Sequence, residues 1–249
     1  MSHHIVEAQG LGYSYPDGTP ALEDIRLRVE HGEAVALVGE NGAGKSTLLR
    51  HFTGCLFASS GGLVIGGLPV EKKNLAEVRR AVGMVFQNPD DQLFMPTVFE
   101  DVAFGLLNLG IPAAELEGRV MEALATVGAA HLRARPPYRL SQGEKRAVAI
   151  AGVLAMRPDI LIMDEPTSNL DPASRRRLIN LLRTFKHTRI IATHDLDFAL
   201  EVCGRAVLLH RGRVIADGPA AKVLADDALL AAASLEKPPS LGGPVAGRG

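Results

Sequence analysis

The sequence is poor in the residues that support redox chemistry, metal clusters or membrane spans. It has no tryptophan, 2 cysteines and 4% aromatic residues in a chain of 249. Cys55 and Cys203 have no paired spacing of the kind that zinc sites or disulfide frameworks need, so we interpret both as small apolar residues. The longest apolar run, Ala147 to Met156, is much shorter than the about 20 residues of a spanning helix. We therefore expect no redox centre and no transmembrane segment.

Neither sign of charge dominates. Lysine and arginine number 27 against 28 acidic residues, which gives a net charge of −1. The chain therefore has no overall basic field to attract nucleic acid or an anionic membrane, and any such partner would be met locally. The first seven residues lack a cationic region followed by an apolar one, so we expect no export signal and a cytoplasmic location.

The hydrophobic pattern predicts an α/β fold with a mostly parallel sheet. Residues 25–30 alternate between apolar and charged, which indicates an antiparallel N-terminal β-subdomain. Three continuous apolar runs, 34–38, 160–163 and 190–192, are typical of strands buried on both faces. The pattern between about 98 and 156 indicates an inserted α-helical subdomain. We expect one domain over 5–236, with a hairpin near 207–216, and a disordered tail over 237–249 that is rich in proline and glycine.

A glycine-rich motif follows the first of these buried strands. It matches the phosphate-binding loop pattern of Gly, four residues, Gly-Lys-Ser, in which backbone N–H groups surround phosphate oxygens. The helix that follows, Lys45 to Phe52, would direct its positive N-terminal end toward the same anion. A turn that binds nothing is the alternative, but the preceding strand and following helix argue against it. The predicted nucleotide-binding residues are Gly39, Glu40, Asn41, Gly42, Ala43, Gly44, Lys45, Ser46 and Thr47.

Two carboxylates follow the second buried strand, at the sheet edge where such folds bind ligands. Asp164 would bind Mg²⁺ through water, the Ser46 hydroxyl would bind the same ion, and Glu165 would polarise the water that attacks the γ-phosphate. Lys45 would place its charge at the β- and γ-phosphates. Acidic residues also cap helices, and that simpler role suits Asp171, which precedes Pro172. The combination predicts a P-loop NTPase core of the RecA-like kind.

Further motifs narrow the class of nucleotide hydrolase. Leu140-Ser141-Gln142-Gly143-Glu144 lies about twenty residues before the acidic pair and resembles the signature motif of ABC-type ATPases. Gln87, the run 168–171 and the run 193–195 complete that family's pattern in order. No guanine-reading motif is present, which disfavours a GTPase. A P-loop small-molecule kinase would leave Ser141, Gly143 and His194 without a role.

The resemblance implies an ATP site shared by two copies of the ATPase, with Mg²⁺ as cofactor. In it, His194 would bond the γ-phosphate and Gln87 would sense the metal and the attacking water. The partner copy would contribute Ser141 and Gly143, so a monomer would be catalytically incomplete. Tyr15 would stack on adenine, with Tyr13 as the rival for that role. Gln142 and Glu144 replace the commoner glycine and glutamine. An active enzyme is expected, unless Gln142 blocks the partner's nucleotide and leaves a degenerate site.

The segment from Phe86 to Phe94, with Pro96 to Gly105, is similar to the ATP-binding subunits of energy-coupling factor transporters, particularly those importing cobalt and nickel. This implies a second ATPase subunit, a transmembrane coupling protein and a substrate-binding membrane subunit as partners, at the cytoplasmic face of the membrane. Leu93 and Phe94 are either part of that interface or core residues. The alternatives are the shared ATPase of a biotin- or riboflavin-type importer and a soluble ABC ATPase outside transport. Nucleic acid is not expected as a partner.

Overall fold

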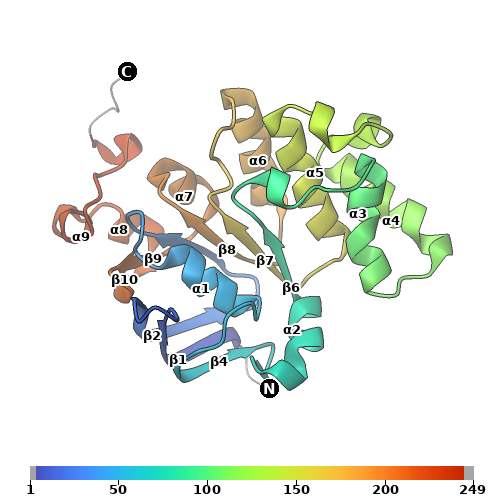
Figure 1. Cartoon of the computed structure of the whole chain (residues 1–249). Helices are drawn as coiled ribbons and strands as arrows, with labels where there is room; N and C mark the ends of the chain where they lie inside the picture. Colours follow the sequence, from blue (N-terminus) through green and yellow to red (C-terminus); the bar gives the residue numbers. More distant parts are fainter. Residues whose placement is uncertain (1–3, 244–249) are drawn as a thin grey trace. The chain divides into compact units, whose positions relative to one another are not determined.

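The computed structural model describes residues 4–243, which fall into two compact units. The first unit combines 4–79 with 187–243, and the second comprises 80–186. Figure 1 shows the path of the chain through both. No helix among the described residues is long and apolar enough to cross a membrane.

The first unit holds an antiparallel sheet that begins the chain. Its strands are β1 (His4–Ser14), β2 (Pro20–Glu30), β4 (Ser60–Ile65) and β5 (Leu68–Pro69), in the spatial order β2-β1-β4-β5. The inward side chains of β2, Ile25, Leu27 and Val29, are buried while their neighbours are exposed, as the alternating sequence predicts. Figure 1 shows β1 between β2 and β4.

A second set of strands in the first unit carries the parallel pairing. β3 (Ala34–Val38) pairs in parallel with both β8 (Thr188–Thr193) and β9 (Arg205–His210), and β10 (Arg213–Pro219) completes the predicted hairpin with β9. Four residues of β3 are fully buried, which explains its continuous apolar sequence. The other elements of this unit are α1 (Lys45–Phe52), η1 (Lys72–Asn74), α7 (Leu196–Val202), α8 (Ala220–Val223), α9 (Asp227–Ala232) and η5 (Pro239–Leu241).

The second unit combines one parallel strand pair with most of the long helices. The pair is β6 (Val82–Val85) and β7 (Ile160–Asp164). Helices α3 (Val98–Asn108), α4 (Ala113–Thr126) and α5 (Gln142–Ala155) fill the segment predicted to be helical and pack on one another. Helix α6 (Pro172–Thr184) follows β7, and the 3-10 turns are η2 (Pro89–Asp91), η3 (Ala130–Leu132) and η4 (Pro137–Arg139). Helix α2 (Leu75–Ala81) includes the point in the sequence, between Arg79 and Arg80, at which the first unit ends and the second begins.

Two observations differ from the sequence predictions. The tail expected to be disordered has structure over residues 237–243, where Pro239–Leu241 forms a 3-10 turn and Lys237 pairs with Asp227 at 2.8 Å. Residues 244–249 lie outside the described part of the chain. The second difference is Cys55, which is exposed although both cysteines are expected to behave as small apolar residues. Cys203 is buried as expected, and burial raises the pKa of its thiol to about 12.

Replacement of two adjacent leucines on α3 tests whether the assigned core stabilises the second unit. Leu106 is fully buried in the core formed by α3, α4 and α5, whereas Leu107 is 56% exposed. We expect Leu106→Ala to lower the free energy of unfolding by about 2–5 kcal/mol, because it removes buried methyl groups and leaves a cavity. The matched variant Leu107→Ala should change it by less than about 0.5 kcal/mol. Urea denaturation followed by circular dichroism measures both, and equal losses would contradict the assigned core.

Candidate functional site

The predicted phosphate-binding loop connects β3 to α1 in the first unit. Val38 ends the strand and Lys45 begins the helix, as the motif requires. Gly44 has a φ of 104°, and a Cβ there would lie 2.9 Å from the carbonyl oxygen of Ala21. Only glycine therefore allows the loop to turn into α1 so close to the neighbouring backbone.

Lys45 is held against the inner side of this loop. Its Nζ donates hydrogen bonds to the carbonyl oxygens of Gly39 at 2.6 Å and Glu40 at 3.0 Å. The residue is only 6% exposed, so its charge lies within the loop and not in bulk water. A positive charge in that place, at the N-terminal end of a helix, favours binding of a phosphate chain.

Tyr13 and Tyr15, the two candidates for adenine stacking, make different contacts in an aromatic cluster next to the loop. The Tyr15 hydroxyl lies 2.8 Å from Thr47 Oγ1, while Tyr13 packs edge-to-face on His51 with ring centroids 4.8 Å apart. His51 Nδ1 lies 2.8 Å from the Thr47 carbonyl oxygen, and burial lowers the pKa of His51, which favours a neutral ring donating to that oxygen. Tyr13 is thus fixed inside the cluster, and Tyr15 is the tyrosine bonded to a residue of the motif.

His194 leaves the same sheet edge as the phosphate-binding loop. In the parallel pair β3 and β8, Val38 lies beside Thr193, so Gly39 and His194 are the next residues of adjacent strands. His194 is exposed, and the chain after it is fixed because Asp195 caps α7 by accepting a hydrogen bond from the Phe198 N–H at 2.9 Å. The first unit therefore gathers the loop and His194 at one edge of its parallel strands.

The acidic pair lies at the corresponding edge of the second unit. Val85 pairs with Met163, so the chain leaves β6 toward Gln87 beside the point where β7 reaches Asp164. Asp164 and Glu165 are 7% and 6% exposed, whereas Gln87 is exposed. The backbone of Glu165 has a φ of 44°, a strained conformation for a residue with a side chain, costing roughly 1–3 kcal/mol and typical of functional sites.

The cap of helix α6, which follows the acidic pair in the chain, is formed by Asp171 and not by Asp164 or Glu165. Asp171 caps α6 by accepting hydrogen bonds from the backbone N–H groups of Ala173 and Ser174 at 2.9 and 3.0 Å. Hydrogen bonds from Ser174 also lower the pKa of Asp171. The capping role that the sequence suggested for Asp171 is confirmed, so this helix N-terminus does not require either residue of the acidic pair.

The signature motif forms the N-terminal end of α5. Ser141 is the N-cap: its Oγ accepts from the Glu144 N–H at 3.3 Å, while the Glu144 carboxylate accepts from the Ser141 N–H at 2.8 Å. These bonds hold the pKa of Glu144 below its usual value. Glu144 departs from the family's signature pattern, but Ser-x-x-Glu before a helix is also the sequence pattern of a capping box, the signal that identifies its role.

Gly143 is required by the close approach of α5 to α6. A Cβ at this position would lie 2.3 Å from Ser174 Oγ and 3.1 Å from Ser174 Cβ, so a side chain would displace the Ser174 hydroxyl, which donates to Asp171. Gln142 beside it is exposed. Ser141 and Gly143 therefore occupy the start of α5, while Gln87 and the acidic pair follow β6 and β7.

The predicted site residues are thus divided between the two units. The loop, Tyr15 and His194 belong to the first, and Gln87, Ser141, Gly143, Asp164 and Glu165 belong to the second. The candidate magnesium ligands Ser46, Gln87 and Asp164 offer hydroxyl, amide and carboxylate oxygens, the donor type that Mg²⁺ prefers. Among residues 4–243, no cluster of three or more histidine, cysteine or acidic side chains could hold a metal ion.

Leu93 and Phe94 have different environments. Leu93 packs against the helical core of the second unit, whereas Phe94 is 63% exposed and contacts Phe104 edge-to-face at 5.0 Å. Phe94, Phe104 and Leu107 are all exposed apolar residues of this segment and of α3, and we call them the α3 patch. The core interpretation therefore holds for Leu93 and fails for Phe94.

Comparison with known proteins gives relatives that match almost the whole chain. A protein of Geobacter sulfurreducens with a provisional ABC transporter ATP-binding name is 61% identical over 249 residues, covering 100% of both chains. The cobalt import ATP-binding protein CbiO of Rhodobacter capsulatus is 48% identical, over 94% of this chain and 85% of that protein. The energy-coupling factor transporter ATP-binding protein EcfA of Methanocaldococcus jannaschii is 46% identical, over 94% and 86%.

Solved structures agree with these relatives. CbiO1 of Clostridium perfringens, described as part of the ABC transporter complex CbiONQ, matches with a TM-score of 0.83 and 40% identity over 93% of this chain and 94% of that one. An ATP-binding cassette solved as a dimer with ADP and Pi matches with a TM-score of 0.78 and 27% identity, over 86% and 98%. They confirm the predicted fold class.

The family model for ABC transporters matches residues 22–168, which include the phosphate-binding loop, the signature motif and the acidic pair. This agrees with the order of motifs in the sequence and excludes the small-molecule kinase alternative. The chain therefore belongs to the ABC transporter family, as an ABC-type ATPase whose relatives include ATP-binding proteins of the energy-coupling factor and cobalt-import kinds.

Proposed function

We propose that the chain is the ATP-hydrolysing motor subunit of an energy-coupling factor importer, most simply one for cobalt or nickel ions. The observation that supports the coupling role is the α3 patch, in which exposed Phe94 lies seven residues after Gln87 and exposed Leu107 lies twenty residues after it. Exposed apolar patches mark protein contacts, and this one joins the segment that would respond to the γ-phosphate. The name of the Rhodobacter capsulatus relative supports cobalt as cargo, whereas the name of the Methanocaldococcus jannaschii relative gives no cargo. The biotin- or riboflavin-type importer is the alternative.

In the proposed reaction each residue contributes one physical effect. The loop N–H groups and Lys45 bind the triphosphate, and His194 donates to its γ-phosphate. Ser46, Asp164 and Gln87 would hold Mg²⁺, which neutralises charge on the β- and γ-phosphates when bound. Glu165 accepts a proton from the water that attacks phosphorus and orients that water. Ser141 and Gly143 of a second copy supply the hydroxyl and helix N-terminus that complete the site.

The second copy and the membrane partners belong to the same proposal. A dimer is favoured because Ser141 is placed at a helix N-terminus, the arrangement that binds an anion. A transmembrane coupling protein would contact the α3 patch, and a separate membrane subunit would bind the cargo. The chain would thus act at the cytoplasmic face of the membrane. A soluble ABC ATPase outside transport is the remaining alternative.

Replacement of Glu165 tests the hydrolytic step. Glu165→Gln keeps the size of the side chain but removes the charge that accepts a proton, so we expect ATP binding to persist while turnover falls by about 10²–10⁴. Phosphate release and ATP titration measure the two quantities. Asp159→Asn is the control, because Asp159 is an exposed acid just before the opposite end of β7. Turnover near normal in Glu165→Gln would remove this residue from its role.

A ligand that lacks adenine distinguishes whether Tyr15 or Tyr13 stacks on the base of ATP. Tyr15→Ala should weaken ATP binding by roughly tenfold, because a stacked aromatic ring contributes about 1–3 kcal/mol per base, while leaving binding of inorganic tripolyphosphate unchanged. Tyr15→Phe keeps the ring but loses the bond to Thr47, and should bind ATP nearly as well as the native chain. A larger selective loss of ATP in Tyr13→Ala would assign adenine to Tyr13 instead.

Copurification tests partner and cargo together. The chain should recover a transmembrane coupling protein from detergent-solubilised native membranes, and Leu107→Lys should abolish that recovery because it places a charge in the α3 patch. Ile215→Lys, an exposed apolar position on β10, is the control. One dedicated cobalt- or nickel-binding subunit supports metal import, and several vitamin-binding subunits indicate the vitamin importer. Recovery of soluble proteins or nucleic acid alone would contradict transport.

A further inference from the structure

Arg146 is a buried cation on α5 that belongs to none of the nucleotide-binding motifs. It lies five residues after Ser141 and is 3% exposed. Its Nη1 donates to the carbonyl oxygen of Phe86 and its Nη2 to that of Gln87, both at 2.5 Å. The planar guanidinium therefore bonds two consecutive carbonyls of the segment that carries Gln87, a geometry that the single ammonium of lysine does not reproduce.

Burial of the Arg146 guanidinium costs free energy that a residue serving only to fill the core would not need to spend. Both of its hydrogen-bond acceptors are neutral carbonyls, and its buried Nε has no hydrogen-bond partner. Burial accordingly lowers the pKa of Arg146. Buried cations without a carboxylate are commonly less stabilising than apolar side chains of similar volume, so a positional role explains the residue better than stability.

Two further contacts join the same segment to the same helix. Lys145 Nζ lies 2.6 Å from the Asp90 carboxylate, and the Gln92 side chain donates to the carbonyl oxygen of Ala149 at 3.0 Å. The Gln92 oxygen in turn accepts from the Phe86 N–H at 3.1 Å. Residues 86–92 are thus fastened along the first two turns of α5, and Arg146 provides the contact nearest to Gln87.

We propose that Arg146 is a positioning residue that makes the Gln87 backbone and the signature helix α5 move as one body. This rests on the proposed function, in which Gln87 acts on the ATP of its own subunit and Ser141 on that of the partner copy. A displacement of Gln87 is then transmitted along α5 to Ser141. Arg146 thereby links the two ATP sites of a dimer without touching either nucleotide.

Arg146→Ala tests this in the full-length chain. We expect the ATP dissociation constant to stay within about twofold, since the loop is unchanged, while kcat falls by about 10–100-fold because Gln87 and Ser141 lose their fixed relation. Hydrogen exchange should show loss of protection in residues 86–92 with protection retained in residues 147–155. Arg146→Lys keeps the charge without the fork and should show the same split.

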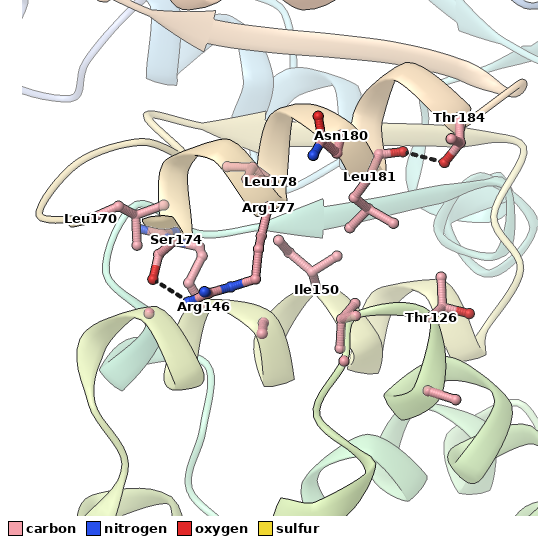
Figure 2. Close-up of a pocket in the computed structure, with 15 residues that line it drawn as sticks. Thr126, Arg146, Ile150, Leu170, Ser174, Arg177, Leu178, Asn180, Leu181 and Thr184 are labelled. Carbon is pink, nitrogen blue, oxygen red and sulfur yellow. Dashed lines mark hydrogen bonds between the residues drawn. The ribbon is translucent and has the colours of Figure 1, made fainter. Parts of the chain in front are cut away.

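Chemical rescue distinguishes position from packing. Arg146 lines a cavity of about 450 Å³ in which, as Figure 2 shows, Ile150 of α5 faces Leu178 and Leu181 of α6. Millimolar methylguanidinium can enter such a space and should restore part of the kcat of Arg146→Ala. Lys145→Met, which removes only the ion pair with Asp90, is the control and should keep kcat within about threefold.

The outcomes separate this inference from the function on which it rests. Unchanged kcat and exchange in both Arg146 variants would overturn it, as would a loss of protection along all of α5 that methylguanidinium does not reverse. Absence of ATP hydrolysis by the native chain would instead contradict the proposed function. The exchange measurement needs no turnover, so it decides the link between residues 86–92 and α5 in either case.

Discussion

Parallel pairing of buried strands is the constraint on which the proposed chemistry depends. In the first unit the pairing of Val38 with Thr193 sends the phosphate-binding loop and His194 out from one edge. In the second, the pairing of Val85 with Met163 does the same for Gln87 and Asp164. Because a register shift by one residue would invert every side chain, the apolar burial of these strands also fixes the polar groups that follow them.

Two glycines allow close contacts that a side chain would disturb: Gly44 lies against backbone, and Gly143 lies against the Ser174 side chain. Gly44 admits the turn from the loop into α1 beside Ala21, and Gly143 admits the first turn of α5 beside Ser174. Both lie at the N-terminal end of a helix, where unpaired N–H groups attract anions. The same ends are held by side chains: Lys45 bonds the loop carbonyls, and Glu144 bonds the N–H of Ser141.

The polar contacts of α5 add a mechanical link to these chemical groups. Arg146 and Lys145 bond the segment after β6, and the apolar face of the helix packs with α3 and α4. Phe104 and Leu107 of the α3 patch are exposed on α3, the helix that shares this core. Helix α5 thus carries the signature motif, bonds the Gln87 segment and packs on α3. These contacts connect the residues proposed to act on ATP with the surface proposed to bind a membrane partner.

The sequence by itself determined the elements and most of the motif residues, because buried parallel strands are continuously apolar and phosphate loops need glycine at fixed spacing. The strand over 34–38, the helix over 45–52 and the cap at Asp171 occur as predicted. Tertiary structure alone decided that Leu93 packs against the helical core while Phe94 is exposed, and which tyrosine bonds Thr47. It alone showed that Arg146 bonds carbonyls sixty and fifty-nine residues away, since no local pattern encodes a contact that depends on how strand and helix pack.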